Sequence, residues 1–326
     1  MSKIAASKLA VVILAAGKGS RMKSTTPKVL HKLAGRELIL HVLDAVAPLQ
    51  PHKTIVITGH AAEDVEACIN THHPAAQCIR QQEQNGTGHA VQQAEDALRG
   101  FEGTVVILNG DVPLIQTAPL EAFIHNHVQD RNAISVASTV APDPTGLGRI
   151  LREDDGTFTG IREHKDATDE EREIDEVNVG FYAAENTHLF NLLGQVTNNN
   201  AQGEYYLPDI VPLALQANLP CEAHYFEQPA EDLTGINNRG QLAMAEIALQ
   251  DKLREMHMAN GVTLQDPATV YFAWDTEIAP DVTIEPNVVF GENVQVAEGV
   301  TISTFSRIQD TIVKSDIPSF SNIKAS

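Results

Sequence analysis

The stretch from residue 278 onward repeats an apolar residue every six positions, a period that few folds accommodate. The repeating residues are Ile278, Ile284, Phe290, Val296, Ile302 and Ile308, and a second set lies four residues after each: Val282, Val288, Val294, Val300, Ser306 and Ile312. In a β-helix each six-residue side packs one aliphatic side chain inward, so the repeat predicts a β-helix of hexapeptide repeats. Six such repeats make only about two triangular coils, so we expect the tail from residue 310 to 326, or another subunit, to cap the stack.

Upstream of this repeat, short apolar segments alternate with helical patterns. We expect strands over 9–14, 54–58, 78–81, 104–108 and 134–140, and helices over 38–46, 61–70, 88–98 and 120–128. This alternation predicts an α/β fold, a mostly parallel sheet covered on both faces. Ligands of such sheets bind at the carboxyl ends of the strands, and the loops after Leu14 and Leu108 would lie on that same edge.

The region between these two parts is mixed. Charged residues over 163–176 predict a solvated loop, and the flanking segments 150–151 and 177–183 could pair as a β-ribbon. A helix is predicted over 237–260, because two asparagines can cap its start and Gly261 can end it.

The loop after the first strand is typical of a phosphate site. It reads Ala15-Ala16-Gly17-Lys18-Gly19-Ser20-Arg21-Met22, and Pro27-Lys28 follows. The two glycines allow backbone N–H groups to close on an anion, and three cations lie nearby. The loop matches neither the dinucleotide-binding pattern nor the P-loop. Glycines in a tight turn can have a purely steric role, but clustered cations favour a phosphate-bearing ligand.

The net charge limits the class of partner. The 326 residues carry 23 basic and 43 acidic side chains, a formal charge of −20. Long-range repulsion therefore disfavours nucleic acid or an anionic membrane, and a small anionic substrate would need local cations and a divalent metal. The cysteines Cys68, Cys78 and Cys221 form neither a C-x-x-C pair nor a zinc pattern, which favours a cytoplasmic location. No apolar run is long enough to cross a bilayer.

Three further loops contain residue types suited to chemistry. Asp111 follows the strand 104–108 and could be a turn residue, but beside a phosphate loop we favour a carboxylate that holds Mg²⁺. The segment 81–89 is rich in glycine and amide side chains, which could read the edge of a base or form an ordinary loop. The segment 146–149 is a third tight glycine loop, and its role is ambiguous by itself.

Taken together, these motifs resemble the signature of sugar-1-phosphate nucleotidyltransferases. The similar segments are 14–22, 27–30, 81–90, 110–114, 143–146, 163–168, 198–206 and 235–239. They narrow the resemblance to the family of bacterial bifunctional N-acetylglucosamine-1-phosphate uridyltransferase/glucosamine-1-phosphate acetyltransferases, over residues 8 to about 312. The resemblance implies a Rossmann-like doubly wound sheet followed by a short left-handed parallel β-helix. We therefore expect a nucleotidyltransferase domain over 1–236, a connecting helix over 237–265 and the β-helix over 266–326.

The resemblance also implies a reaction. This is uridylyl transfer from UTP to N-acetylglucosamine 1-phosphate, giving UDP-N-acetylglucosamine and pyrophosphate, with Mg²⁺ as cofactor and in-line attack without a general base. Relatives trimerise through the β-helix, so a homotrimer is allowed. The family's acetyltransferase residues lie beyond these repeats, and we expect that activity to be absent.

Specific residues are assigned by the same resemblance. Arg21 and Lys28 would be catalytic, and Asp111 and Asn237 would hold Mg²⁺. The substrate-binding residues would be Leu14, Ala15, Ala16, Gly17, Lys28, Gln81, Gly86, Thr87, Asn109, Gly110, Asp111, Gly148, Glu163, Asn178 and Asn237. Of these, Gln81, Gly86 and Thr87 would contact uracil, and Gly148, Glu163 and Asn178 the N-acetylglucosamine moiety.

Two alternatives remain open. The chain departs from the family pattern at Asn109, where many relatives have tyrosine, and at Val179, where threonine is common. A nucleotidyltransferase for another sugar 1-phosphate or nucleotide, such as a thymidylyl- or cytidylyltransferase, shares the glycine loop. A non-catalytic regulatory homologue is disfavoured, because the expected cations and metal ligands are present.

Overall fold

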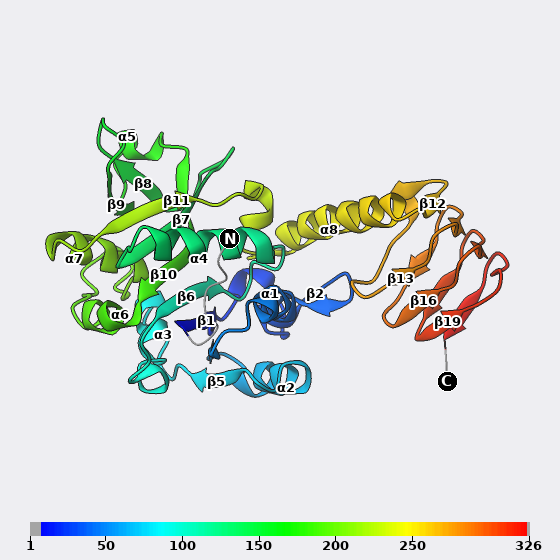
Figure 1. Cartoon of the computed structure of the whole chain (residues 1–326), viewed down its shortest axis with the longest axis horizontal. Coiled ribbons are helices and arrows are strands. Elements are labelled where there is room, and N and C mark those ends of the chain that lie inside the picture. The colour runs from blue at the N-terminus through cyan, green and yellow to red at the C-terminus, as the bar shows by residue number, and fades with distance from the viewer. Residues whose placement is uncertain (1–7, 325–326) are drawn as a thin grey trace. The chain divides into compact units, whose positions relative to one another are not determined.

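The computed structural model describes residues 8–324, which form two compact units (Figure 1). The first unit comprises residues 8–30 and 38–237, and the second comprises residues 31–37 and 238–324. The segment 31–37 therefore groups with residues far along the chain, and the helix after Asn237 belongs to the second unit instead of standing alone. As a division into domains, the three-part scheme from the sequence stays a prediction.

The first unit is built on a nine-stranded sheet. Its strands are β1 (Leu9–Ala15), β4 (Lys53–Thr58), β5 (Gln77–Arg80), β6 (Thr104–Asn109), β7 (Ile134–Val140), β8 (Arg149–Arg152), β9 (Phe158–Arg162), β10 (Glu176–Glu185) and β11 (Cys221–Tyr225). The main order is β11-β7-β10-β6-β1-β4-β5, and β8 and β9 pair beside β10. Of the described strands in the main order, β10 runs against the rest. The predicted mostly parallel sheet is confirmed.

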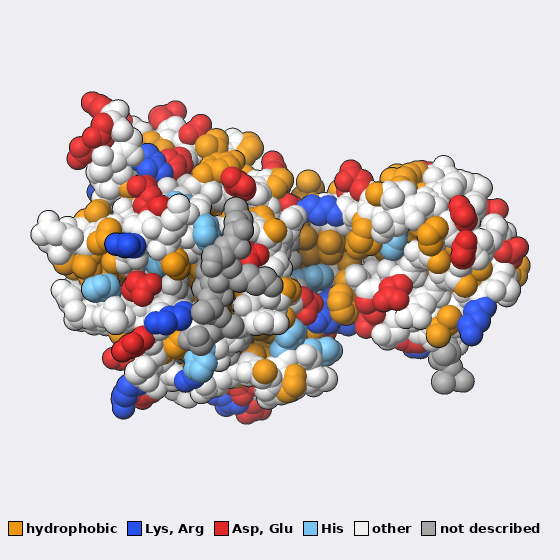
Figure 2. Space-filling model, in the orientation of Figure 1, with side chains coloured by type: hydrophobic (Ala, Val, Ile, Leu, Met, Phe, Trp, Pro, Cys, Tyr) orange, Lys and Arg blue, Asp and Glu red, His pale blue; other side chains and the backbone are white. Residues whose placement is uncertain are grey.

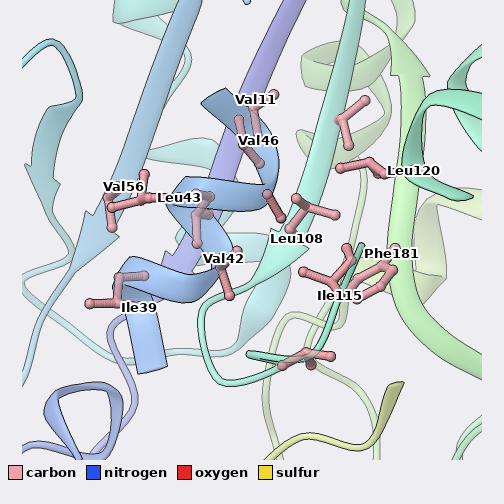
Figure 3. Close-up of a cluster of buried hydrophobic side chains, with 14 of the residues drawn as sticks. Val11, Ile39, Val42, Leu43, Val46, Val56, Leu108, Ile115, Leu120 and Phe181 are labelled. Carbon is pink, nitrogen blue, oxygen red and sulfur yellow. The ribbon is translucent and has the colours of Figure 1, made fainter. Parts of the chain in front are cut away.

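Helices cover both faces of this sheet. The helices of the first unit are α1 (Leu38–Val46), α2 (Ala62–His72), α3 (Thr87–Gln92), α4 (Thr117–Gln129), α5 (Asp169–Arg172), α6 (Asn186–Leu193) and α7 (Ile210–Gln216), of which α5 has no buried residue. Along β1, Val11 and Ile13 pack with α1, α2 and α4, whereas Ala10 and Val12 pack with α3, α6 and α7. Figure 3 shows α1 laid on the first of these faces. Successive residues of a strand point to opposite faces, so an apolar run such as 9–15 requires two covered faces.

Three local expectations need correction. The helix expected over 88–98 ends at Gln92, and the chain continues through turns into a 3₁₀ segment, Asp96–Leu98. The loop expected over 163–176 contains α5, which begins with a reciprocal capping box between Thr168 and Glu171. The ribbon expected between 150–151 and 177–183 is nearly absent from the described pairing, because β8 pairs mainly with β9 and meets β10 only at Val177.

The second unit contains three short parallel sheets that form the sides of a β-helix. Its elements are β2 (Lys32–Leu33), β3 (Arg36–Glu37), α8 (Arg239–Ala259), β12 (Thr263–Leu264), β13 (Glu277–Ile278), β14 (Thr283–Ile284), β15 (Val289–Phe290), β16 (Val294–Val296), β17 (Thr301–Ile302), β18 (Arg307–Gln309), β19 (Thr311–Val313) and β20 (Asn322–Lys324). The sheets are β12-β14-β17, β13-β16-β19 and β15-β18-β20. The predicted short β-helix is confirmed, and β20 continues one of its sheets.

The hexapeptide register holds until residue 308 and then slips by one. Ile284, Phe290, Val296, Ile302 and Ile308 are all buried, as expected. Ile312, however, is 59% exposed and pairs with Gln295, while Val313 is buried and pairs with Val296. Residues with a positive φ recur every six positions along the β-helix, at Asp281, Asn287, Asn293, Gly299 and Phe305. The next such residue, Asp310, comes only five positions later. The missing residue turns Ile312 outward, because a one-residue slip moves a side chain to the other face.

Helix α8 and the hairpin β2–β3 complete the second unit. Asn238 caps α8 through its side chain, as predicted, but the buried positions of the helix are Gln250, Arg254 and His257. Gln250 exchanges hydrogen bonds with the backbone of Phe272, so polar side chains there satisfy strand groups. In the hairpin, the Arg36 guanidinium lies 3.9 Å above the Trp274 ring. No described helix is both long and apolar enough to span a membrane.

Candidate functional site

A cavity of about 910 Å³ opens in the first unit at the carboxyl ends of β1 and β6. Leu14 and Asn109 are register partners on these adjacent parallel strands. The loops that follow them therefore leave the sheet on one edge, as the sequence predicts.

Most of the residues assigned by resemblance line this cavity. They are Leu14, Ala15, Ala16, Gly17, Lys28, Gln81, Gly86, Thr87, Asn109, Asp111, Asn178 and Asn237. Four do not. Arg21 is exposed in a 3₁₀ turn, and its side chain forms no hydrogen bond or ion pair within the described residues, whereas Gly110 is buried against Leu14 and Ile39. Gly148 and Glu163 lie behind the lining, next to Asn178.

Lys28, Asp111 and Asn237 meet at the centre of the cavity wall. The Lys28 ammonium donates to Oδ2 of Asp111 in a short contact and to Oδ1 of Asn237 at 3.1 Å. The Lys28 and Asp111 side chains are each only 15% exposed. Residues distant in sequence thus place a carboxylate and an amide oxygen around one cation.

Backbone contacts fix the two oxygens. The N–H of Ile236 donates to the carbonyl of Asp111 at 2.9 Å, which joins the segment before Asn237 to the loop after β6. The Asn237 amide nitrogen donates to the Gly235 carbonyl at 3.0 Å, which turns Oδ1 toward Lys28. Gly235 itself leaves no spare room, because a Cβ there would lie 3.3 Å from Oδ1 of Asp111.

This arrangement fits a divalent cation. Oδ2 of Asp111 and Oδ1 of Asn237 already converge on a positive charge, and Mg²⁺ binds proteins through one or two such oxygens plus substrate phosphates. In the described part of the chain, no group of three or more His, Cys, Asp or Glu side chains could hold a metal. The cavity is lined by two basic side chains, Lys18 and Lys28, and by four acidic ones, Asp111, Asp143, Glu204 and Glu231. An anionic ligand therefore needs an added cation here.

A second end of the cavity carries amide and hydroxyl groups. Gln81 is only 4% exposed, and its amide nitrogen donates to the Gly86 carbonyl at 3.2 Å and contacts Nδ1 of His89 at 3.0 Å. Thr87 Oγ1 accepts from the Leu207 N–H at 3.0 Å. Gly86 has a φ of 110°, and a Cβ there would lie 2.5 Å from the Tyr205 carbonyl, so the turn needs glycine.

The third group lies around Asn178. The strand β10 has an irregular register between Asn178 and Tyr182, which aims Asn178 into the cavity. The Asn178 side-chain amide donates to the Tyr182 hydroxyl at 2.7 Å, and the Asn178 backbone N–H donates to the Gly148 carbonyl at 2.8 Å. Burial, with help from Asp166 and Asp209, raises the pKa of Glu163.

The two departures from the family pattern are also in the wall. Asn109 and Val179 line the cavity, and the Asn109 amide donates to the Gly180 carbonyl at 3.4 Å. Gly180 has a φ of 86°, and a Cβ there would lie 2.6 Å from the Asn109 amide nitrogen. The close approach of the Asn109 amide therefore requires glycine at position 180.

One wall was missed by reasoning from the sequence. Ala230, Glu231, Leu233 and Thr234 line the cavity ahead of Gly235, and Glu204 lines it from another loop. The segments 198–206 and 235–239 carried part of the resemblance, but no local pattern marked 230–234 as part of a site.

Comparison with known proteins places this architecture in a family. Residues 11–174 match the MobA-like NTP transferase domain. The chain is 44% identical to the bifunctional protein GlmU of Zymomonas mobilis over 307 residues, which are 94% of this chain and 68% of the relative. It is 42% identical to the GlmU of Streptococcus equi subsp. zooepidemicus, covering 83% of this chain, and 43% identical to that of Lactococcus lactis, covering 82%.

The matches to the last two relatives span 58% and 57% of those proteins. On identity and coverage together, the chain belongs to the family of the bifunctional GlmU proteins and carries its MobA-like NTP transferase domain.

Proposed function

We propose that the chain transfers a uridylyl group from UTP to N-acetylglucosamine 1-phosphate in a Mg²⁺-dependent reaction. The observation that carries this proposal is the meeting of Lys28, Asp111 and Asn237 in a cavity that also contains the Gln81 amide and Asn178. A cation site flanked by two polar ends suits a triphosphate between a base and a sugar. Family membership supports the same reaction class.

The nucleophile needs no general base. A phosphate monoester has a second pKa of about 6, so the sugar phosphate is already largely a dianion at neutral pH. Its oxygen attacks the α-phosphorus in line, the bond to the β-phosphate oxygen breaks, and pyrophosphate leaves. Positioning and electrostatic stabilisation supply most of the catalysis in phosphoryl transfer, and the same reasoning applies to nucleotidyl transfer.

The chain's residues divide this work. Asp111 and Asn237 would hold Mg²⁺, which would neutralise charge between the phosphates of the two substrates. Lys28 would exchange its contacts with these oxygens for the triphosphate, and Arg21 would approach from the exposed side of the glycine loop. Gln81, Gly86 and Thr87 would bind the uracil, and Gly148, Glu163 and Asn178 the sugar. Leu14 to Gly17 and Asn109 would contact the substrates from the cavity wall, and Gly110 would support that wall from behind.

A substrate panel tests the proposal. Pyrophosphate release is measured for four nucleoside triphosphates against several sugar 1-phosphates, with and without Mg²⁺. We expect the highest kcat/KM for UTP with N-acetylglucosamine 1-phosphate and no turnover without a divalent ion. A preference for another nucleotide or sugar would contradict the specificity, and binding without turnover would favour a regulatory homologue.

Three further expectations stay predictions. Cys68, Cys78 and Cys221 form no disulfide within the described residues, which agrees with the cytoplasmic location that we propose. An acetyl-CoA assay beside the panel checks whether acetyl transfer is absent. Light scattering checks whether the β-helix supports a homotrimer.

A further inference from the structure

Arg149, the first residue of β8, is a buried cation whose hydrogen bonds go mainly to backbone carbonyls. It is the largest side chain that is almost fully buried among the described residues, with 1% exposure. Within the described part of the chain, no carboxylate forms an ion pair with it. Burying a guanidinium is costly unless its hydrogen-bonding groups are satisfied, so its contacts must compensate.

All five N–H groups of Arg149 have acceptors. Nη1 donates to the carbonyl of Pro144 at 2.7 Å and, in a short contact, to that of Leu147. Nε and Nη2 both donate to the carbonyl of Arg172, at 3.4 and 3.1 Å. The remaining Nη2 hydrogen is directed to Nδ1 of His164 at 3.4 Å, and Nδ1 accepts because a guanidinium can only donate.

These acceptors belong to two loops that are separate in sequence. Pro144 and Leu147 lie between β7 and β8, and His164 and Arg172 lie in and before α5. The planar fork of one guanidinium therefore ties the loop 143–148 to the segment 164–172. A lysine at this position would present one donor centre and could not reach both loops in the same geometry.

Both loops continue directly into the sugar end of the cavity. Asp143 and Leu147 line it, Gly148 precedes Arg149, and Glu163 precedes His164. A Cβ on Gly148 would lie 3.3 Å from Oε1 of Glu163, so these two residues are in close contact. Arg149 itself does not line the cavity.

We propose that Arg149 is a positioning residue for the sugar phosphate, acting by holding the loops that carry Gly148 and Glu163. This inference rests on the proposed function, because it assigns the sugar to that end of the cavity. A change at Arg149 should alter the binding of the sugar phosphate and not that of UTP, because the contacts of Arg149 do not involve the Lys28 cluster or the Gln81 turn.

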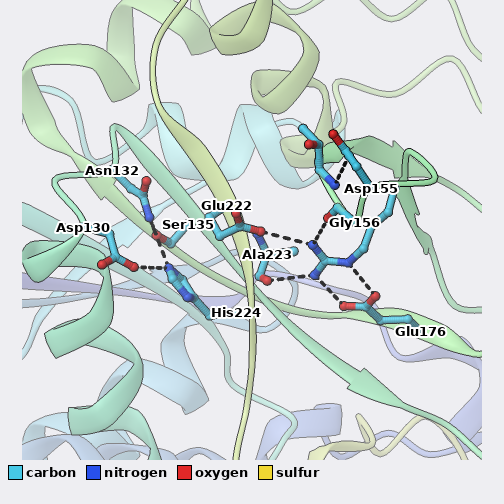
Figure 4. Close-up of polar contacts among 11 residues, drawn as sticks. Asp130, Asn132, Ser135, Asp155, Gly156, Glu176, Glu222, Ala223 and His224 are labelled. Carbon is cyan, nitrogen blue, oxygen red and sulfur yellow. Dashed lines mark hydrogen bonds and ion pairs between the residues drawn. The ribbon is translucent and has the colours of Figure 1, made fainter.

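Arg152, on the same strand, provides a matched control. Its guanidinium pairs with the Glu176 carboxylate at 2.8 and 2.9 Å and with Glu222 at 3.2 Å, and it also donates to the Gly156 and Ala223 carbonyls (Figure 4). These partners lie outside the cavity lining. The two arginines share a strand and a residue type, but Arg149 is buried and contacts the loops beside the cavity, whereas Arg152 is exposed and contacts residues outside the lining.

Steady-state kinetics of Arg149→Lys and Arg152→Lys test the inference. We expect Arg149→Lys to raise the KM for N-acetylglucosamine 1-phosphate about tenfold or more while the KM for UTP changes less than about twofold, because misplacing positioning groups is costly. Arg152→Lys should leave both values close to wild type. Equal changes in both KM values, or none, would overturn the inference.

Two readouts separate this inference from the proposed function. Added guanidinium should partly restore the sugar KM of Arg149→Ala, which a general loss of folding would not allow. Hydrogen exchange should rise over 143–148 and 164–172 in Arg149→Lys but not in Arg152→Lys, and this needs no substrate. Unchanged hydrogen exchange in both segments would refute the role of Arg149, even if the wild-type protein is active. A wild-type protein that is inactive on the substrate panel would instead refute the proposed function and leave the role of Arg149 to the exchange data.

Discussion

Gly19 packs directly against the first carbons of the Lys28 side chain. Its φ is 58°, and a Cβ there would lie 2.6 Å from Cβ of Lys28. The obstructing atom is the root of the lysine side chain and not its flexible end. Any larger residue at position 19 must therefore displace the stem that delivers the ammonium to Asp111.

Gly19→Ala should therefore reduce turnover without removing a charge. We expect kcat/KM to fall at least about tenfold, together with roughly 1 kcal/mol of destabilisation from the left-handed backbone. Gly100→Ala is the control, because Gly100 also has a positive φ, 75°, but a Cβ there meets nothing within 4 Å. Equal activity of the two variants would show that Lys28 placement does not depend on Gly19.

Single residues differ in how far the sequence reveals them. Lys28 and Asp111 follow apolar strands within recognisable motifs, and their meeting at one sheet edge follows from parallel topology. The contact of Asn237 with Lys28, by contrast, depends on the long-range bond between Ile236 and Asp111. Arg149 lies in the tight glycine loop 146–149, but its role gives no signal in sequence, because its acceptors other than His164 are backbone carbonyls that any residue type provides.

In the β-helix, the loss of one residue from the six-residue repeat changes which side chains point inward. Ile308 is 0% exposed and Ile312 is 59% exposed, although both fit the period-six pattern. The five-residue step from Phe305 to Asp310 accounts for the difference.

Ile308→Thr and Ile312→Thr form a matched pair that tests this register. The change at the buried site should lower the free energy of unfolding by about 2 kcal/mol or more, through lost packing and a buried hydroxyl. The exposed site should change by less than about 0.5 kcal/mol. Urea unfolding followed by the chain's one tryptophan, Trp274 in the second unit, reports both. A similar loss at both sites would mean that the register does not slip.

Helix α8 contributes a pH dependence to the same unit. His257 is 2% exposed and packs against Phe272 with the rings tilted by 41° and their centroids 4.5 Å apart, and burial lowers its pKa below 6.5. The unfolded chain then binds a proton more readily than the folded one as the pH falls. The stability that neutral His257 provides is therefore complete above pH 6.5 and is lost as the pH falls toward the lowered value.

Urea unfolding at several pH values, followed by Trp274, measures this effect. The wild type should lose at most about 1.4 kcal/mol per pH unit from this one proton below pH 6.5. His257→Leu should have a smaller slope over that range, whatever its absolute stability. Identical slopes for the two proteins would contradict the assignment.

Elements were predictable where their pattern was long and strictly periodic. The five leading strands and the hexapeptide repeat follow from such patterns. The pairing of β8 with β9 and the association of β2–β3 with the second unit depend on contacts across the chain, which local sequence does not encode.

Across the whole molecule, the dominant physical feature is its negative charge. Acidic side chains lie on the visible face of both units (Figure 2), in keeping with 43 acidic against 23 basic residues. Both proposed substrates are anions, so the long-range field opposes their approach while the local cations favour binding.

Added salt should therefore raise kcat/KM. Between about 0.01 and 0.1 M salt the screening length falls from about 30 to 10 Å, which removes the long-range repulsion before the contacts inside the cavity are weakened. We expect roughly a twofold to fivefold increase, measured with UTP below its KM in NaCl at constant free Mg²⁺. A steady decrease would mean that the local cations dominate the approach.

We propose that Asp111 and Asn237 hold a divalent cation against a bound nucleoside triphosphate. Single-turnover formation of UDP-N-acetylglucosamine across a Mg²⁺ titration tests it directly, with Asp111→Asn beside wild type and the surface variant Asp96→Asn as control. We expect Asp111→Asn to be at least about a hundredfold slower than wild type and to need more Mg²⁺, and Asp96→Asn to match wild type. A wild-type rate and Mg²⁺ dependence in Asp111→Asn would contradict it.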